Sequence, residues 1–169
     1  SLAKENNVVF MEAVKTAYCP GFHAMMAAAK SGKIGRIIDV EAAFSRLTPV
    51  NTREYMAQDY NGSFLEFGSY VCMPVFELLG CDYDDVRFHS MRAVNGVDAY
   101  TKAVFSFGGK SAEVKTGLGV KTEGQLLISG TNGYILAKSP WWLTKEFEIR
   151  YEDPNKKEVY KYAYEGSGL

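Results

Sequence analysis

Cysteine is scarce in this sequence, and its three copies, Cys19, Cys72 and Cys81, include no Cys-x-x-Cys pair. An odd number of cysteines at these spacings suits neither a disulfide framework nor a zinc site. The sequence therefore indicates free thiols in a reducing compartment, and we expect a cytoplasmic protein without a metal site.

Long apolar runs and an excess of basic residues are also missing. No stretch of about 18 apolar residues occurs, so we expect no membrane span. The start, SLAKENNVVFMEA, lacks the basic-then-apolar order of a signal peptide. The 19 basic and 20 acidic residues give a formal net charge of −1, which offers no support for a nucleic-acid or anionic-membrane partner.

The sequence does contain the composition of a globular domain, with 47% hydrophobic and 23% charged residues in a chain of 169. The stretch PGFHAMMAAAKSG predicts a helix that opens on Pro20 and stops near Gly32. The apolar residues that recur on one face of this helix are Phe22, Met25, Met26 and Ala29.

Strand patterns dominate the rest of the chain. The first is RIIDVEAAFSRL, and those after Gly80 are DVRFHSMRA, AYTKAVFSF, KSAEVKTGL, GQLLISG, YILAK, KEFEIRYE and KEVYKYAYE. Helices followed by a series of strands predict an α+β fold, in which a large, mostly antiparallel open β-sheet carries its helices on one face.

Residues 61–80, NGSFLEFGSYVCMPVFELLG, predict a helix with polar residues near its start. Ser63 and Glu66 fit a capping box, in which Ser63 caps the helix and Glu66 bonds back to it. Tyr70 follows Glu66 by four residues and shares its face. Spacing alone does not make Tyr70 catalytic, because no cation that would help a phenol exchange a proton stands nearby in the sequence. The residues expected on the packed face are Leu65, Gly68, Cys72, Val75 and Leu79.

The pair Trp141-Trp142 has two readings. It could form a platform for stacking a sugar, but such a pair more often covers the edge of a core or an interface, and we favour the second reading.

The beginning of the chain, AKENNVVFMEA, reads as the end of a helix, a short turn and a buried strand VVFM, which is too little to fold as a unit. We therefore expect residues 1–13 to be the tail of a preceding domain. Residues 14–169 are expected to form a domain whose own C-terminal end, at YEGSGL, is cut.

Several segments together resemble the C-terminal domain of the Gfo/Idh/MocA oxidoreductases, the family of glucose-fructose oxidoreductase, inositol dehydrogenase and dihydrodiol dehydrogenase. In the family's order, and over nearly the whole chain, they are VVFMEA, CPGFHAMMAAAKSGKIGRI, NGSFLEFGSYVCMPVFELLG and ISGTNGYILAKSPWW. The third resembles the family's helix with an Asp-Gly-x-His/Tyr motif, which lines the substrate cleft.

The resemblance implies that residues 1–13 end a Rossmann dinucleotide-binding domain. It also implies that residues 14–169 form the substrate-binding and oligomerisation domain of an enzyme that transfers a hydride between NAD or NADP and a sugar, polyol or similar carbinol or carbonyl. Tyr70 falls on the residue that is proposed to exchange the proton, and substrate contacts are implied for Glu66, Ser63 and Glu12.

The nucleotide-binding half of such an enzyme is missing from this sequence, which has no G-x-G-x-x-G fingerprint and no Glu-Lys-Pro lysine. We therefore expect no cofactor-binding residue in this chain, and neither NAD(P) binding nor turnover by the chain alone. The resemblance further implies a homodimer or higher oligomer through the open sheet face, where Tyr160, Tyr162 and Tyr164 would suit the interface.

Three departures from the family pattern leave another reading open. Glu66 stands in place of the family's Asp, Asn61 in place of the first of two glycines, and Ala17 in place of an Arg. A non-catalytic relative with a regulatory or sensing role is therefore an alternative. A stand-alone carbohydrate-binding module built on Trp141 and Trp142 is another.

Overall fold

One sheet of eight strands organises the molecule, in the order β2-β3-β4-β1-β5-β6-β7-β8. The computed structural model describes residues 2–56 and 61–166. Neighbouring strands pair antiparallel, with the exception of β1 and β4, which are parallel. Strand β1 thus lies at the centre and joins two antiparallel units, β2-β3-β4 and β5-β6-β7-β8. The predicted α+β fold with a mostly antiparallel open sheet is confirmed.

The predicted strands are all present, and their bounds are β1 (Ile37–Ser45), β2 (Asp85–Arg92), β3 (Asp98–Phe107), β4 (Lys110–Gly117), β5 (Leu126–Gly130), β6 (Tyr134–Ala137), β7 (Glu146–Arg150) and β8 (Lys157–Lys161). The helices are α1 (Leu2–Glu5), α2 (Pro20–Lys30), α3 (Arg53–Met56) and α4 (Ser63–Leu79), with 3-10 turns η1 (Lys15–Tyr18) and η2 (Trp141–Leu143). None of the helices in the described part of the chain is long and apolar enough to span a bilayer.

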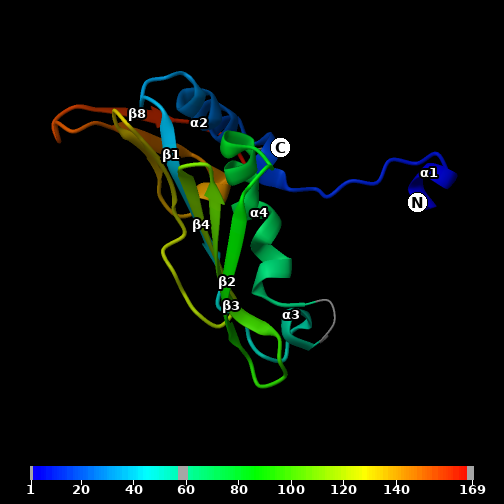
Figure 1. The fold of residues 1–169 in the computed structure, drawn as a ribbon. Helices are drawn as coiled ribbons and strands as arrows, with labels where there is room; N and C mark the ends of the chain where they lie inside the picture. The colour runs from blue at the N-terminus through cyan, green and yellow to red at the C-terminus, as the bar shows by residue number, and fades with distance from the viewer. Residues whose placement is uncertain (1, 57–60, 167–169) are drawn as a thin grey trace.

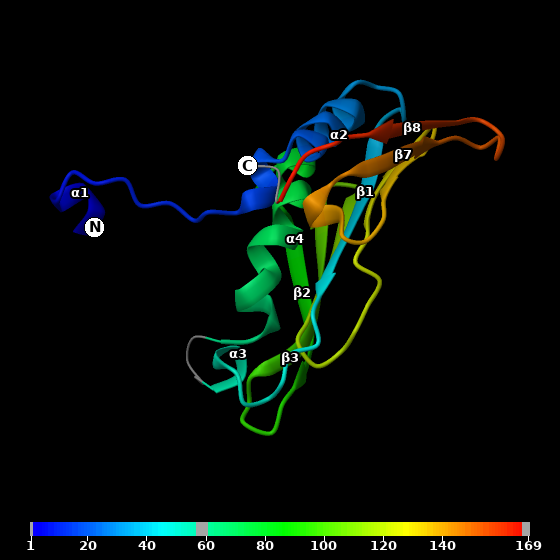
Figure 2. The ribbon, with the colours of Figure 1, turned by 180° about the vertical axis from the view of Figure 1, so that it is seen from behind.

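Helices α2 and α4 cover the same face of the sheet, as Figure 1 and the reverse view in Figure 2 show. The apolar face predicted for α2 is confirmed, because Phe22, Met25, Met26 and Ala29 are all at most 2% exposed. Helix α4 buries Val71 and Val75 in the same core, which also contains Val40, Ala103 and Val114 of the strands beneath it.

The packed face predicted for α4 is partly wrong. Leu65 is 65% exposed, whereas Phe67, Gly68, Val71 and Val75 are buried. Because apolar residues occur on most sides of this helix, their spacing does not choose between two neighbouring stripes. Contact with the sheet selects which stripe is buried, and it is the stripe that contains Phe67, Val71 and Val75.

The opposite face of the sheet carries ion pairs. Glu113 Oε2 lies 2.5 Å from Lys102 Nζ, and its Oε1 lies 2.7 Å from Lys115 Nζ. Burial alone would raise the pKa of Glu113, but the bonds from the two lysines outweigh burial and lower it. Further along the same face, Glu148 lies 2.6 Å from Arg150.

The tyrosines expected at an interface on that open face lie on the helix-covered face instead. The Tyr160 ring stacks on Phe147, a core residue, with ring centroids 4.8 Å apart. Tyr162 stacks on the same ring at 6.2 Å. The Tyr164 hydroxyl donates to the Leu143 carbonyl and accepts from the Cys19 thiol. The prediction was wrong because the register of β8 against β7 pairs Tyr160 with the inward-facing Phe147.

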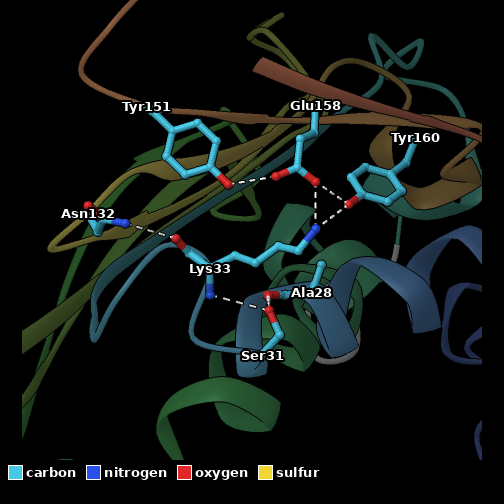
Figure 3. A network of polar contacts seen from close by, with 7 residues as sticks. All are labelled: Ala28, Ser31, Lys33, Asn132, Tyr151, Glu158 and Tyr160. Atoms are coloured by element: carbon cyan, nitrogen blue, oxygen red, sulfur yellow. Dashed lines mark hydrogen bonds and ion pairs between the residues drawn. The ribbon is translucent and has the colours of Figure 1, made fainter. Parts of the chain in front are cut away.

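A polar cluster fastens the edge strand β8 to the turn after α2 (Figure 3). Lys33 Nζ lies 2.5 Å from Glu158 Oε2 and 2.7 Å from the Tyr160 hydroxyl, and the Tyr151 hydroxyl donates to Glu158 Oε1 at 2.7 Å. The hydrogen bonds from Lys33, Tyr160 and Tyr151 lower the pKa of Glu158 to about 2. The bonds of Lys33 to Glu158, the larger cause, and to Tyr160 raise the pKa of Lys33.

This cluster predicts a specific loss of stability in acid. Because the pKa of Glu158 is lowered by folding, its contribution is complete above the ordinary value of 4.5 and is lost as the pH falls toward 2. Thermal unfolding should show Glu158→Gln melting below the wild type at pH 7, with the gap closing between pH 4.5 and 2. Glu152→Gln, on the exposed hairpin before β8, is the control and should shift nothing. A gap that stays constant with pH would contradict the cluster.

The segment between α1 and η1 leaves the body of the molecule on the helix side of the sheet (Figure 1). The expected buried strand VVFM is wrong for this structure: Val9 is 90% exposed and Phe10 is 89% exposed, and neither lies in a strand. Within the described residues, no strand pairs with this segment. The apolar side chains of Val9 and Phe10 are therefore not covered by a sheet or a helix in the described part of the chain.

Candidate functional site

Helix α4 carries the candidate residues, and its start is held by an aspartate from another element. The helix N-cap is Gly62, and no side chain of α4 makes the capping bond. The Ser63 hydroxyl instead donates to Asp98 Oδ2 at 2.6 Å, and the backbone N–H of Phe64 donates to the same oxygen at 3.0 Å. The predicted capping box of Ser63 and Glu66 is therefore wrong, because Asp98 of β3 satisfies the amide that a capping side chain would satisfy.

Gly62 permits this contact. Its φ of +132° is a conformation that residues with a side chain rarely adopt. A Cβ added at Gly62 would lie 1.8 Å from Asp98 Oδ1. The backbone can approach the carboxylate only because no side chain stands between them.

Substitution of Gly62 should therefore cost more stability than its backbone angle alone explains. Gly80, at the other end of α4, also has a positive φ, of +88°, but an added Cβ there meets nothing within 4 Å. Both alanine variants bear backbone strain of about 1–3 kcal/mol, and only Gly62→Ala also displaces Asp98. In urea unfolding, Gly62→Ala should lose at least about 1 kcal/mol more than Gly80→Ala. Equal losses would show that the Asp98 contact contributes little.

The Glu66 carboxylate lies among cations that the sequence did not reveal as neighbours. Arg46 NH2 lies 3.8 Å from Glu66 Oε1, and Arg53 NH2 lies 3.7 Å from Oε2. Arg46 also lies 3.3 Å from Glu54. Because Arg46 follows β1 and Arg53 begins α3, only the folded chain brings these charges to α4. The two arginines therefore lie beside Glu66, which precedes Tyr70 by one helical turn.

Tyr70 lies on the same face of α4, half-buried, with its ring edge-on to Phe44 at a centroid distance of 5.3 Å. Within residues 2–56 and 61–166, its hydroxyl has no hydrogen-bond partner. The phenol is thus held by packing of its ring, and its oxygen remains available to a ligand.

The wall beside Tyr70 is a column of stacked rings. Phe44 lies between Trp142, at 3.8 Å and 5°, and Phe67, at 4.3 Å and 11°. The Arg46 guanidinium lies over Phe67 at 5.6 Å. Stacked aromatic pairs contribute about 0.5–1.5 kcal/mol each beyond their buried area, so this column makes a stiff wall.

The tryptophan pair covers the edge of the core, as favoured from the sequence. Trp141 is fully buried, and its Nε1–H donates to the Ala43 carbonyl at 2.8 Å. A sugar platform built on both tryptophans is therefore excluded, since Trp141 has no accessible ring face.

Of the four predicted site residues, the structure brings Glu66 and Tyr70 to one accessible face. Ser63 is 0% exposed and its hydroxyl also lies 2.9 Å from that of Thr116. Glu12 is exposed on the N-terminal segment.

A cavity of about 260 Å³ beside Glu66 is lined by Arg53, Glu54, Asn61, Gly62 and Leu65. In the described part of the chain, no three His, Cys, Asp or Glu side chains converge as metal ligands.

Most of the chain matches the model of one known protein family. Residues 22–136 match the family model of the GFO/IDH/MocA C-terminal domain. The chain belongs to this family. The matched range runs from α2 to β6 and includes α4 with Glu66 and Tyr70, and the family resemblance predicted from the sequence is thereby confirmed.

Two curated relatives are dehydrogenases. The chain is 25% identical over 154 residues to trans-1,2-dihydrobenzene-1,2-diol dehydrogenase from Bos taurus, covering 89% of this chain and 45% of that protein. It is 28% identical over 163 residues to the NADP(+)-dependent scyllo-inositol 2-dehydrogenase from Bacillus subtilis, covering 90% of this chain and 48% of that protein. The chain thus spans about half the length of these relatives.

Solved structures share the fold. The 3-ketoreductase KijD10 from Actinomadura kijaniata, in complex with NADP and TDP-benzene, superposes with a TM-score of 0.78 at 19% identity. The match covers 95% of this chain and 51% of that one.

Proposed function

We propose that this chain is the substrate-binding domain of an NAD(P)-dependent oxidoreductase that acts on the CH–OH or carbonyl group of a sugar or polyol. The observation that carries the proposal is the placement of Tyr70 and Glu66 on the accessible side of α4, within the range that matches the family. The relatives named above, a dihydrodiol dehydrogenase and an inositol dehydrogenase, support the reaction type.

Tyr70 is proposed to move the proton. In the reducing direction, its phenol donates a proton to the substrate oxygen while the carbon receives a hydride, and the phenolate regains a proton from solvent. Its hydroxyl is suited to this because no described residue competes for it as a hydrogen-bond partner. Arg46, held near α4 by Glu66, is proposed to bring positive charge to this side of the site.

The remaining site residues are proposed to bind and orient. Glu66 accepts hydrogen bonds from substrate hydroxyls, and the ring column of Phe44 and Trp142 excludes water from one side. Glu12, on the segment that leaves the domain, closes the site from the junction. Because Ser63 is buried against Asp98, we propose that it holds α4 in place instead of touching substrate.

The cofactor site is proposed to lie in a Rossmann domain that precedes residue 14, because this chain has no dinucleotide fingerprint. Bound there, NADH or NADPH would supply the hydride in the reducing direction, and the oxidised cofactor would accept it in the other. The exposed apolar residues Val9 and Phe10 support the proposal, since they suit a strand that such a domain would cover. A cytoplasmic location with free thiols belongs to the same proposal.

Replacement of Tyr70 tests the reaction directly. In the full-length protein, Tyr70→Phe keeps the ring against Phe44 and removes only the hydroxyl. If the phenol exchanges the proton, kcat for NADP-dependent oxidation of scyllo-inositol or of a trans-dihydrodiol should fall about 10²–10⁴-fold, with KM little changed.

Tyr83→Phe is the matched control, because Tyr83 is also a partly exposed ring packed by aromatic contacts, against Phe76 and Phe105. It should leave kcat unchanged. Wild-type turnover in Tyr70→Phe would contradict the role, and no turnover by the wild type with NAD or NADP on any polyol would favour the non-catalytic alternative.

A second copy of the chain is proposed to cover the open sheet face. That face carries no helix in the described residues, and its charges alternate in sign around Glu113. Lys102→Glu with Lys115→Glu would place three acidic residues together and should convert a dimer into a monomer in sedimentation equilibrium. Lys4→Glu with Lys30→Glu reverses two charges elsewhere and should leave the dimer intact. A wild-type monomer at high concentration would contradict the proposal.

A further inference from the structure

One carboxylate oxygen at the start of β3 receives hydrogen bonds from two elements. Asp98 Oδ2 accepts from the Thr101 hydroxyl at 2.8 Å, within its own strand. It also accepts from the Ser63 hydroxyl at 2.6 Å and from the Phe64 N–H at 3.0 Å, both at the start of α4. Thr101 therefore fixes the carboxylate on the sheet, and the carboxylate fixes the helix.

The network reaches the strands on both sides of β3. The Ser63 hydroxyl lies 2.9 Å from that of Thr116 in β4, and the Thr101 hydroxyl lies 2.9 Å from that of Ser90 in β2. Thr101 and Thr116 are both at most 2% exposed. Within the described residues, no buried polar side-chain atom is left without a partner. The first turn of α4 is thus tied to three adjacent strands.

The rest of the contact between α4 and the sheet is apolar, through residues such as Val71 and Val75. Apolar burial is non-directional, so it holds a helix against a sheet without setting its rotation closely. Hydrogen bonds are directional and weaken steeply as their geometry is lost. The Asp98 network therefore adds a directional constraint on the rotation and axial position of α4 to the apolar contact.

A shift of the first turn of α4 would also move Tyr70. At a rise of about 1.5 Å per residue, Tyr70 lies on the order of 10 Å along the helix from Ser63. A helix turns as one body over this distance, so a change at its first turn moves the phenol. A displacement of about 1 Å can cost a reaction roughly 10²-fold.

We propose that Asp98 is a positioning residue, which sets the rotation of α4 and thereby the direction of the Tyr70 phenol. The inference rests on the proposed function for what Tyr70 does, but its effect on the position of Tyr70 is measurable without any activity. The sequence gives no sign of this link, because Asp98 and Ser63 are 35 residues apart.

The test combines two measurements on the full chain: amide hydrogen exchange, and the ¹³Cζ signal of Tyr70, assigned by its loss in Tyr70→Phe. In Asp98→Ala, exchange of the Phe64 amide should accelerate about tenfold, the factor expected from loss of a helix cap, and the Tyr70 signal should move. Asp98→Asn keeps a carbonyl oxygen that can accept the same bonds, so it should restore most of both effects.

Asp84→Ala is the matched control, because the Asp84 carboxylate also accepts a backbone N–H, that of Gly108, at the opposite end of β3 from Asp98. It should change neither measurement. Ser63→Ala, which leaves the Phe64 bond in place, serves if Asp98→Ala does not fold, and should accelerate exchange to a smaller extent and move the Tyr70 signal. Unchanged exchange in these variants, or faster exchange with an unmoved Tyr70 signal, would overturn the inference.

Discussion

The contact between α4 and the sheet is the constraint on which the candidate site depends. Burial of side chains such as Val71 and Val75 contributes roughly 1.5–3 kcal/mol each and holds the helix on β1, β3 and β4. The Asp98 bonds add a directional constraint on how the helix is turned once it is there. Glu66 and Tyr70 reach an accessible face only because both conditions hold.

The elements whose pattern is local could be predicted from the sequence. The apolar face of α2 recurs at helical spacing, and the strands alternate or are bounded by turn residues, so each could be read without knowing its neighbours. The order of the strands in the sheet, and the parallel pairing of β1 with β4, join segments far apart in the chain. No local pattern records such pairings.

The site could be predicted only in part, for the same reason. Glu66 and Tyr70 are four residues apart, so their shared face follows from helix geometry. The cap at Asp98 and the cations at Arg46 and Arg53 come from other elements, and the sequence suggested a capping box within α4 in their place. Tyr160 was misplaced because the direction in which an edge strand faces depends on its register with the strand beside it.

The fold shows what surrounds Glu66, one of the residues that depart from the family pattern. Glu66, where the family has Asp, is held between two arginines, and Arg46 also supplies a cation on this side of the molecule although Ala17 does not.

The central claim is that α4 directs Tyr70 toward the substrate. A crystal structure of the full-length protein with NADP and a bound polyol tests it most directly. The account predicts the Tyr70 hydroxyl within about 3.2 Å of the reacting oxygen. A substrate bound elsewhere, with Tyr70 turned away from it, would contradict the account.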